Sequence, residues 1–135
     1  MKKNRLTEQV SEQFRVLQEN LQSQPSSEQK IVVKNQDYIH VLRLKDITHI
    51  EAISSYTKFH LANGSTILAS RHLKHFESLI GGHGFLRVHH TYMVNVQFID
   101  RYVRADSALI VNDQSIPVSH RRREVLTQYL DRLMD

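Results

Sequence analysis

The chain has 135 residues, a formal net charge of +4 and no cysteine, and 40% of its residues are hydrophobic. This length and composition are typical of one globular domain and exclude a wholly disordered chain. The absence of cysteine excludes disulfides, thiolate zinc sites and cysteine nucleophiles, and it suits a reducing, cytoplasmic location. The apolar runs are only a few residues long, and no apolar segment follows Lys2-Lys3. We therefore expect neither a membrane span nor a signal peptide.

The first 30 residues differ in pattern from the rest. Five apolar residues recur there at spacings of four, four, three and four, which predicts a helix with one apolar stripe: Leu6, Val10, Phe14, Leu17 and Leu21. The segment 24–27 then has the composition of a linker. We predict a linker helix and flexible segment over residues 1–30 and a folded domain over residues 31–135. The stripe has three possible partners: the following domain, a second copy, or a preceding domain. Because a linker follows the helix directly, we favour a second copy or a preceding domain as the partner of the stripe.

Short β-strands dominate the pattern from Ile31 onward. We predict strands over 31–33, 38–44, 47–53, 56–61 and 65–69, because β-branched and aromatic residues alternate there with polar ones. Asn63-Gly64 separates the last two segments. This dipeptide is a strong hairpin signal, since both residues tolerate positive φ.

A helix and a second group of strands are predicted next. Ser70 is the expected N-cap, Gly81-Gly82 the expected end, and the buried face comprises Leu73, Phe76, Leu79 and Ile80. Strands follow over 85–88, 92–96, 99–104, 108–111 and 115–118, with a turn at 112–114. Ser119 is the expected cap of a closing helix whose apolar side holds Val125, Leu126, Tyr129, Leu130 and Leu133. The domain is therefore mainly β with two short helices.

Catalytic motifs are missing from the sequence. Gly81 to Gly84 follows a helix and precedes a strand, which is the wrong order for a phosphate-binding loop, and no nucleophile-elbow serine occurs. The acidic residues are scattered, so we expect no enzyme and no cofactor. Nine histidines keep a metal- or proton-sensing regulator as an alternative, although the spacing of His72, His75, His83, His89 and His90 fits no defined zinc motif.

Basic residues cluster near the predicted ends of helices and strands, at Arg71, Lys74, Arg87 and the run His120-Arg121-Arg122-Arg123. Lysine and arginine neutralise DNA phosphates, and hydroxyl groups add neutral contacts to them. The same residues also decorate helix ends and cover the core with their apolar stems. Composition alone leaves both interpretations open.

An ordered set of motifs resembles the LytTR domains, the LytR/AlgR-type DNA-binding domains of bacterial response regulators. Residues 85–95, FLRVHHTYMVN, resemble the family's F-x-R-x-H-x-[ST]-[YF]-x-V-N signature. The family's DI-x-x-IEA strand, its NYT segment, its middle helix and its lPVSRR segment have counterparts at 46–52, 55–57, 70–77 and 116–121. The resemblance covers about residues 31–131.

The resemblance implies an elongated arrangement of short packed sheets and a specific mode of DNA binding. In this family, loops enter successive major grooves on one face of the duplex and bend it. Carried over by position, the candidate DNA-binding residues are Ser54, Ser55, Tyr56 and Lys58; Arg87, His89, His90 and Thr91; Ser119, His120, Arg121 and Arg122; and Arg71 and Lys74 near the middle helix. The implied partners are double-stranded DNA with direct-repeat half-sites, a second copy on that DNA, and a receiver domain outside this chain.

Three positions depart from the family pattern. Members often carry Arg or Asn at the position of His90, Arg at that of His120 and Asn at that of Ser55. Neutral imidazole lacks the bidentate fork of arginine, so either the base preference differs or Arg121 takes over. The departures also keep open a protein-interaction module on the same fold.

Several motif residues have structural roles as alternatives. Arg87 can pair with a carboxylate and shape its loop, and a buried, hydrogen-bonded His89 can orient it. Asn95 can satisfy backbone groups at a strand end. We expect Tyr92, Val94 and Ile99 in the core.

Overall fold

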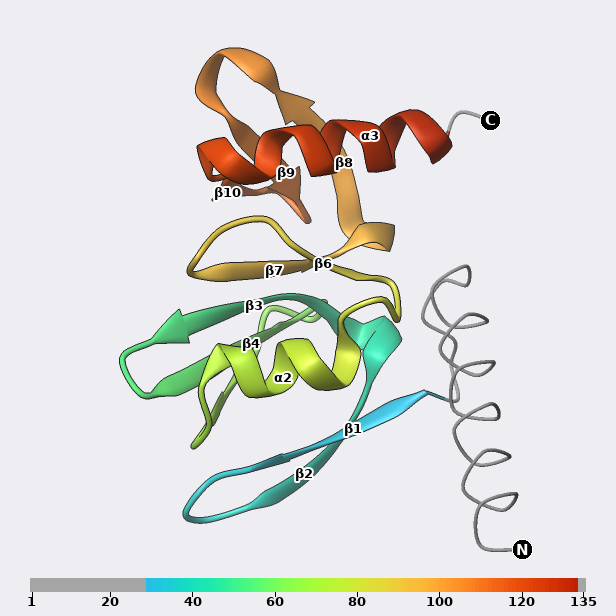
Figure 1. Cartoon of the computed structure of the whole chain (residues 1–135). Helices are drawn as coiled ribbons and strands as arrows, with labels where there is room; N and C mark the ends of the chain where they lie inside the picture. Colours follow the sequence, from blue (N-terminus) through green and yellow to red (C-terminus); the bar gives the residue numbers. More distant parts are fainter. Residues whose placement is uncertain (1–28, 134–135) are drawn as a thin grey trace, which may run out of the picture.

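The computed structural model describes residues 29–133, which form three antiparallel sheets and two helices (Figure 1). The helix predicted over residues 6–21 lies outside this range. The mainly β fold with two short helices is confirmed. Within residues 29–133, neither helix has the length and hydropathy needed to cross a membrane.

A two-stranded sheet lies at one end of the molecule. Strands β1 (Lys30–Lys34) and β2 (Ile39–Arg43) pair so that Val32 faces Val41 and Lys30 faces Arg43. Alternation along β1 buries Ile31 and Val33 and leaves the other three side chains exposed. This sheet therefore covers the core with one face only.

The central sheet has five strands in the order β5-β4-β3-β7-β6. These are β3 (Ile47–Ile53), β4 (Tyr56–Leu61), β5 (Thr66–Ala69), β6 (Phe85–Arg87) and β7 (Tyr92–Asn95). The Asn63-Gly64 hairpin is confirmed, because β4 and β5 pair across it. Only Gly64 has positive φ, at 89°, whereas Asn63 accepts hydrogen bonds from the backbone and hydroxyl of Ser65 through Oδ1.

Helix α2 (Leu73–Ile80) packs on one face of the central sheet and buries Leu73, Phe76 and Ile80. Phe76 meets Phe59 of β4 edge to face, with ring centroids 4.9 Å apart. The predicted burial of Leu79 is wrong: this side chain is 48% exposed. An eight-residue helix contacts the core through one narrow stripe, and Leu79 lies beside it.

The predicted N-cap of α2 is also wrong. His72, not Ser70, precedes the helix, and it makes no side-chain capping bond. Tertiary hydrogen bonds hold residues 70–72 outside the helix: the Ser70 amide donates to Lys34 O, and Thr57 Oγ1 donates to Arg71 O. The helix ends at Ile80 before Gly81, as the sequence predicts.

A three-stranded sheet and helix α3 (Arg123–Leu133) form the other end of the molecule. The strands are β8 (Ile99–Val103), β9 (Ala108–Val111) and β10 (Gln114–Pro117). Their shared core with the central sheet includes Val94, Leu109 and Leu126. Gln114 belongs to β10, so the turn is the pair Asn112-Asp113, and both residues have positive φ, as a tight hairpin requires.

Two predictions about the closing helix are wrong. A 3₁₀ turn over His120–Arg122 precedes α3, and the Ser119 side chain makes no capping bond; instead its carbonyl accepts the Arg122 amide. Val125 and Leu133 are more than half exposed. Val125 is rotated by about 100° from the buried Leu126, and Leu133 lies two turns beyond it at the end of the helix.

Asn95 is a buried polar residue at the end of β7. Its side chain is buried, donates to Leu44 O and Ile47 O at 3.3 and 2.9 Å, and accepts from the Gln97 amide. The expected role in satisfying backbone groups at a strand end is therefore confirmed. Val94 is fully buried in the core that also holds Leu109 and Leu126, which we call the second core, and Tyr92 and Ile99 are half-buried against it.

Candidate nucleic-acid interface

Three connections from different parts of the fold lie along one edge of the molecule (Figure 1). They are the β3–β4 turn, the β6–β7 connection and the β10–α3 connection. Backbone hydrogen bonds join them: Ala52 N donates to Thr91 O at 2.8 Å, and Ser119 N donates to Val88 O at 2.9 Å. The sequence-predicted residues of the three loops therefore form one braced surface, although 65 positions separate Ser54 from Ser119 in the chain.

The first loop is a two-residue turn, Ser54-Ser55, between the paired residues Ile53 and Tyr56. Ser54 has φ of 54°, so the chain reverses sharply and exposes both serines. Tyr56 is 45% exposed beside them. Lys58 lies further along β4, half-buried and opposite Glu51, so it is the member of this group most distant from the turn.

Arg87 organises the second loop from within. Its Nη1 donates to Glu77 Oε1 of α2 at 2.5 Å, its Nε to His89 O at 2.8 Å and its Nη2 to His90 O at 2.5 Å. The side chain is only 12% exposed. Charge-assisted bonds of a planar guanidinium are directional, so Arg87 fixes the path of the loop and is occupied by internal acceptors.

The other residues of this loop differ in exposure. His89 is half-buried, and its Nδ1 accepts the Thr91 amide at 3.0 Å. Burial, followed by the charges of His90, Arg87 and Arg122, lowers the pKa of His89, so its ring stays neutral. His90 is exposed at the tip of the loop. The loop therefore presents one free imidazole above an internally bonded one.

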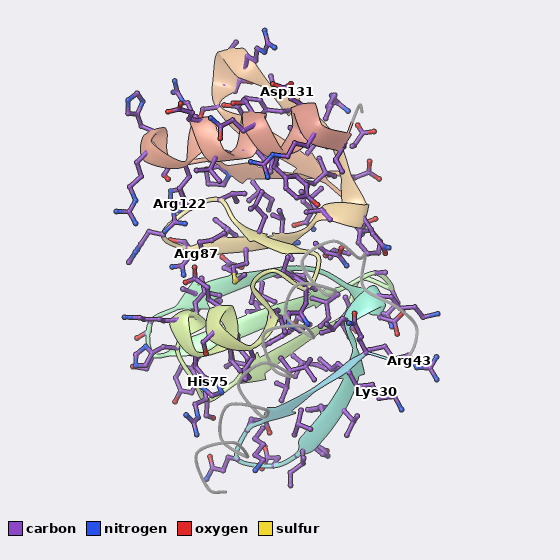
Figure 2. All side chains as sticks on the ribbon, turned by 45° about the vertical axis from the view of Figure 1, so that its right-hand side comes forward. Lys30, Arg43, His75, Arg87, Arg122 and Asp131 are labelled. Atoms are coloured by element: carbon purple, nitrogen blue, oxygen red, sulfur yellow. The ribbon has the colours of Figure 1, made fainter. Side chains whose placement is uncertain are left out.

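The third loop contributes an exposed imidazole and an exposed guanidinium group to this edge. His120 and Arg121 are exposed, whereas Arg122 is half-buried near Arg87 (Figure 2). Burial and the charges of Arg121 and Arg87 lower the pKa of Arg122, which Glu77 partly opposes. Ser119 Oγ is buried without a hydrogen-bond partner among residues 29–133. An anion bound beside Arg87, Arg121 and Arg122 would reduce the repulsion among their guanidinium groups.

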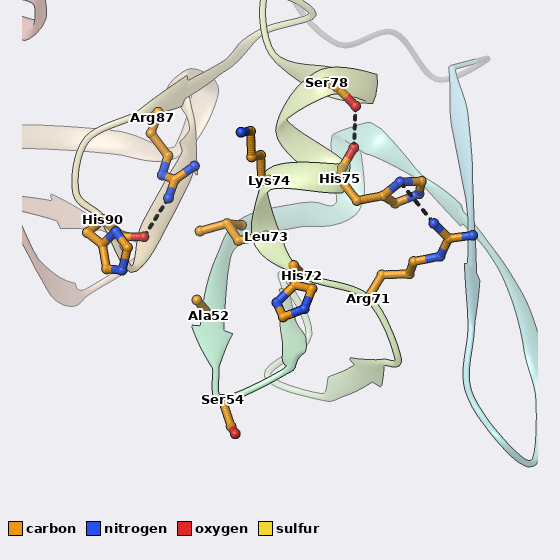
Figure 3. Close-up of a pocket in the computed structure, with 10 residues that line it drawn as sticks. All are labelled: Ala52, Ser54, Arg71, His72, Leu73, Lys74, His75, Ser78, Arg87 and His90. Carbon is orange, nitrogen blue, oxygen red and sulfur yellow. Dashed lines mark hydrogen bonds between the residues drawn. The ribbon is translucent and has the colours of Figure 1, made fainter.

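A pocket of about 670 Å³ lies between the first two loops and the start of α2 (Figure 3). Ser54 and His90 line it from the loops, and Arg71, His72 and Lys74 line it from the helix side. The bond from Thr57 to Arg71 O positions this stretch. A helix capped by Ser70 would have included all three residues, but α2 begins at Leu73, so Arg71 and His72 precede it and only Lys74 lies within it.

The interface is strongly asymmetric in charge. Residues 54–58, 71–75, 87–91 and 119–122 contain six lysines and arginines and none of the 14 acidic residues of the chain. Glu77 is the acidic residue that neutralises Arg87 from outside these stretches. Among residues 29–133 the other five of these cations have no ion-pair partner, so the surface can bind a polyanion.

A polar cluster away from this edge was not foreseen from the sequence. His49 and His60 stack with ring centroids 4.0 Å apart, His60 Nε2 lies 2.9 Å from Glu51 Oε1, and the Tyr92 hydroxyl donates to Glu51 Oε2. Burial and Glu51 raise the pKa of Tyr92. Polar residues at alternate positions of β3 and β4 were the available signal. Within residues 29–133, no three His, Cys, Asp or Glu side chains have an arrangement suited to a metal ion.

Comparisons with known proteins agree with this architecture. A family model described as the LytTr DNA-binding domain matches residues 37–131. No curated protein matches the chain. Among solved structures, the chain is similar to the LytTr DNA-binding domain of a Bacillus cereus protein described as a methyl-accepting/DNA response regulator. The TM-score is 0.65 at 21% sequence identity, over 76% of this chain and 97% of that one, which establishes similarity of fold.

Proposed function

Because the chain belongs to the LytTR family of DNA-binding domains, we propose that it is the sequence-specific output domain of a bacterial transcriptional response regulator. Its three loops would enter successive major grooves on one face of the duplex and bend it. The observation that carries this proposal is the single braced edge on which the loops lie, with the exposed cations Arg121, Arg71 and Lys74, which have no ion-pair partner among residues 29–133. The family binds DNA and is not a family of enzymes.

The proposed contacts divide by geometry. Arg121, Arg71 and Lys74 are exposed cations, suited to phosphates, and the pocket between them and the loops has room for backbone phosphate groups. His90 and His120 are exposed at loop tips, where an imidazole can read a base edge through one donor or acceptor. We assign Arg87 and His89 to positioning, because the guanidinium group of Arg87 and Nδ1 of His89 are hydrogen-bonded inside the protein.

The remaining candidate residues complete the proposed surface. Ser54, Ser55 and Tyr56 offer hydroxyl groups at the first loop, and Thr91 and Ser119 lie where the loops are joined. Arg122 binds phosphate from its half-buried position beside Arg87. Lys58 is the outermost member of the set. As part of the proposal we keep the predicted division into a linker helix and flexible segment at 1–30 and a DNA-binding domain over 31–135. We also propose that two copies occupy direct-repeat half-sites.

The test is selection of bound duplexes from a random library, followed by fluorescence anisotropy on the enriched sequence at several salt concentrations. We expect enriched direct repeats and a steep fall of affinity with salt. Arg121→Gln should lower the magnitude of the slope of log K against log salt by about 0.9 for each phosphate that Arg121 neutralises. His90→Ala should relax the preference at one base position.

The matched control is Arg101→Gln. Arg101 is exposed on β8 and paired with Asp100, away from the three loops, so affinity and salt slope should stay unchanged. Equal losses of affinity in Arg101→Gln and Arg121→Gln would show that binding depends on the net charge of the protein and not on the three loops. No enriched sequence and no binding at low salt would refute DNA recognition and favour the protein-interaction module.

A further inference from the structure

An unexplained groove lies between the start of β1 and the end of α2. The start of β1 lies on the side of the molecule opposite the three loops (Figure 1). The groove has a volume of about 490 Å³. Its floor is made of core residues, namely Ile31, Leu44 and Ile80, which are at most 6% exposed. Its rims are Val32 and Leu79, which are 49% and 48% exposed. Gln29, Lys30 and His83 complete the lining, so the groove is open, mainly apolar and continuous with the core.

The apolar surface continues beyond the groove onto the outward face of the two-stranded sheet. Val41 lies directly opposite Val32 and is 61% exposed, and Ile39 follows on the same strand at 68%. Isolated exposed apolar residues are ordinary, but a contiguous set joined to a groove marks a binding surface. Leu79, the apolar side chain of α2 that fails to enter the core, belongs to this surface.

The charge around the groove is basic and unbalanced. Lys30 and Arg43 face each other across β1 and β2, which places like charges in direct opposition (Figure 2). Lys34 lies further along the same face. None of these three cations has an ion-pair partner among residues 29–133. An occupant with negative charge would reduce this repulsion.

We propose that residues 6–21 of this chain occupy the groove, through the stripe Leu6, Val10, Phe14, Leu17 and Leu21. The described chain begins at Gln29, which itself lines the groove. Eight residue steps separate Leu21 from Gln29, a reach of about 26 Å, and Pro25 lies where the chain must turn back. A 16-residue helix is about 24 Å long, enough to cover the groove and Val41 together.

The sign of the charge agrees with this occupant. Residues 6–21 contain Glu8, Glu12 and Glu19 against the single cation Arg15. On a helix these glutamates lie opposite the apolar stripe, so they attract the basic surface at long range and remain in solvent. The short tether gives an effective concentration in the millimolar range, which favours docking within one chain over pairing between chains. The stripe is then unavailable for self-association. This inference does not depend on the proposed DNA recognition.

The test uses paramagnetic broadening in the whole chain, which has no native cysteine. A spin label on Lys45→Cys stands beside the groove, because Lys45 is exposed and follows the floor residue Leu44. A label on Val125→Cys of α3, in the other end layer, is the matched control. We expect the NMR signals of residues 6–14 to lose at least half their intensity with the first label and to keep it with the second. A free tether would broaden only signals close to Gln29.

Leu79→Glu places a negative charge on the rim and should restore the signals of residues 6–14, while the rest of the spectrum stays unchanged because Leu79 is outside the core. Signals of residues 6–14 that the Lys45→Cys label leaves unbroadened would overturn the proposal. Broadening that survives Leu79→Glu would exclude this groove as the site. Broadening found only when spin-labelled chain is mixed with isotope-labelled, unmodified chain would assign the groove to a second copy and overturn docking within one chain.

Discussion

We predict that His49 makes the stability of this fold depend on pH. It lies on β3 at 2% exposure, stacked on His60. Thr48 Oγ1 donates to His60 O at 3.1 Å, so the hydroxyl oxygen accepts from Nδ1 of His49 at 3.0 Å. The tautomer is thereby fixed with its proton on Nδ1, and a second proton would have to enter at Nε2. Burial, followed by the charge of His60, lowers the pKa of His49 from 6.5 to about 4, against a smaller opposing effect of Glu51.

The direction and size of the effect follow from linkage. Between pH 6.5 and 4 the unfolded chain binds a proton at His49 that the folded protein excludes. The free energy of unfolding is therefore intact above pH 6.5 and falls as the pH drops through this range. At 1.36 kcal/mol per pKa unit, the full loss is about 3 kcal/mol, of which about 2 kcal/mol is lost between pH 7 and pH 5.

The assay is urea unfolding at pH 7 and pH 5, followed by far-UV circular dichroism, on the native protein and on His49→Phe. Phenylalanine keeps an aromatic ring against His60 and removes the titration. Its constant cost in packing and hydrogen bonding cancels when each protein is compared with itself at the two pH values. We expect the native protein to lose about 2 kcal/mol more than the variant. Equal losses in both proteins, or an NMR titration of His49 near pH 6.5, would refute the reasoning.

Three further predictions concern packing and the second loop. Arg87→Lys replaces three directed hydrogen bonds by one point charge. We expect the free energy of unfolding to fall by about 2–3 kcal/mol and the amide of Thr91 to exchange its hydrogen faster. Unchanged exchange at Thr91 would contradict the role of Arg87 in holding the loop. Gly81→Ala would place Cβ 2.5 Å from Glu77 O, so thermal unfolding should show a loss of about 1–3 kcal/mol, and an unchanged midpoint would contradict this geometry. Leu109→Ala in the second core should lower the free energy of unfolding, measured with urea, by about 2–5 kcal/mol. Leu133→Ala changes an exposed residue and should alter this free energy by no more than about 0.5 kcal/mol. Similar values for the two variants would contradict the assigned burial.

The positions of the strands were predictable because they depend on local pattern. Alternation along β1 places its apolar side chains on one face. The residues between β4 and β5 and between β9 and β10 are those that tight hairpin turns favour. The motif over residues 85–95 also identified the family. Helix boundaries were less predictable, since the start of α2 depends on the bond that Ser70 N donates to Lys34 O and the bond that Thr57 Oγ1 donates to Arg71 O, both with residues distant in sequence. Leu79 shows the same limit, because periodicity does not reveal how wide a stripe the sheet can cover.

The sequence by itself determined that the chain is a mainly β domain with basic segments at the ends of its elements, because alternation, turn chemistry and charge are local properties. Only the tertiary structure decided which of these segments lie side by side. Backbone bonds from Ala52 to Thr91 and from Ser119 to Val88 bring three distant loops to one edge. The burial of Arg87 and His89 separates positioning groups from exposed ones such as His90 and Arg121. Both outcomes depend on packing between elements, and spacing along the chain does not specify such packing.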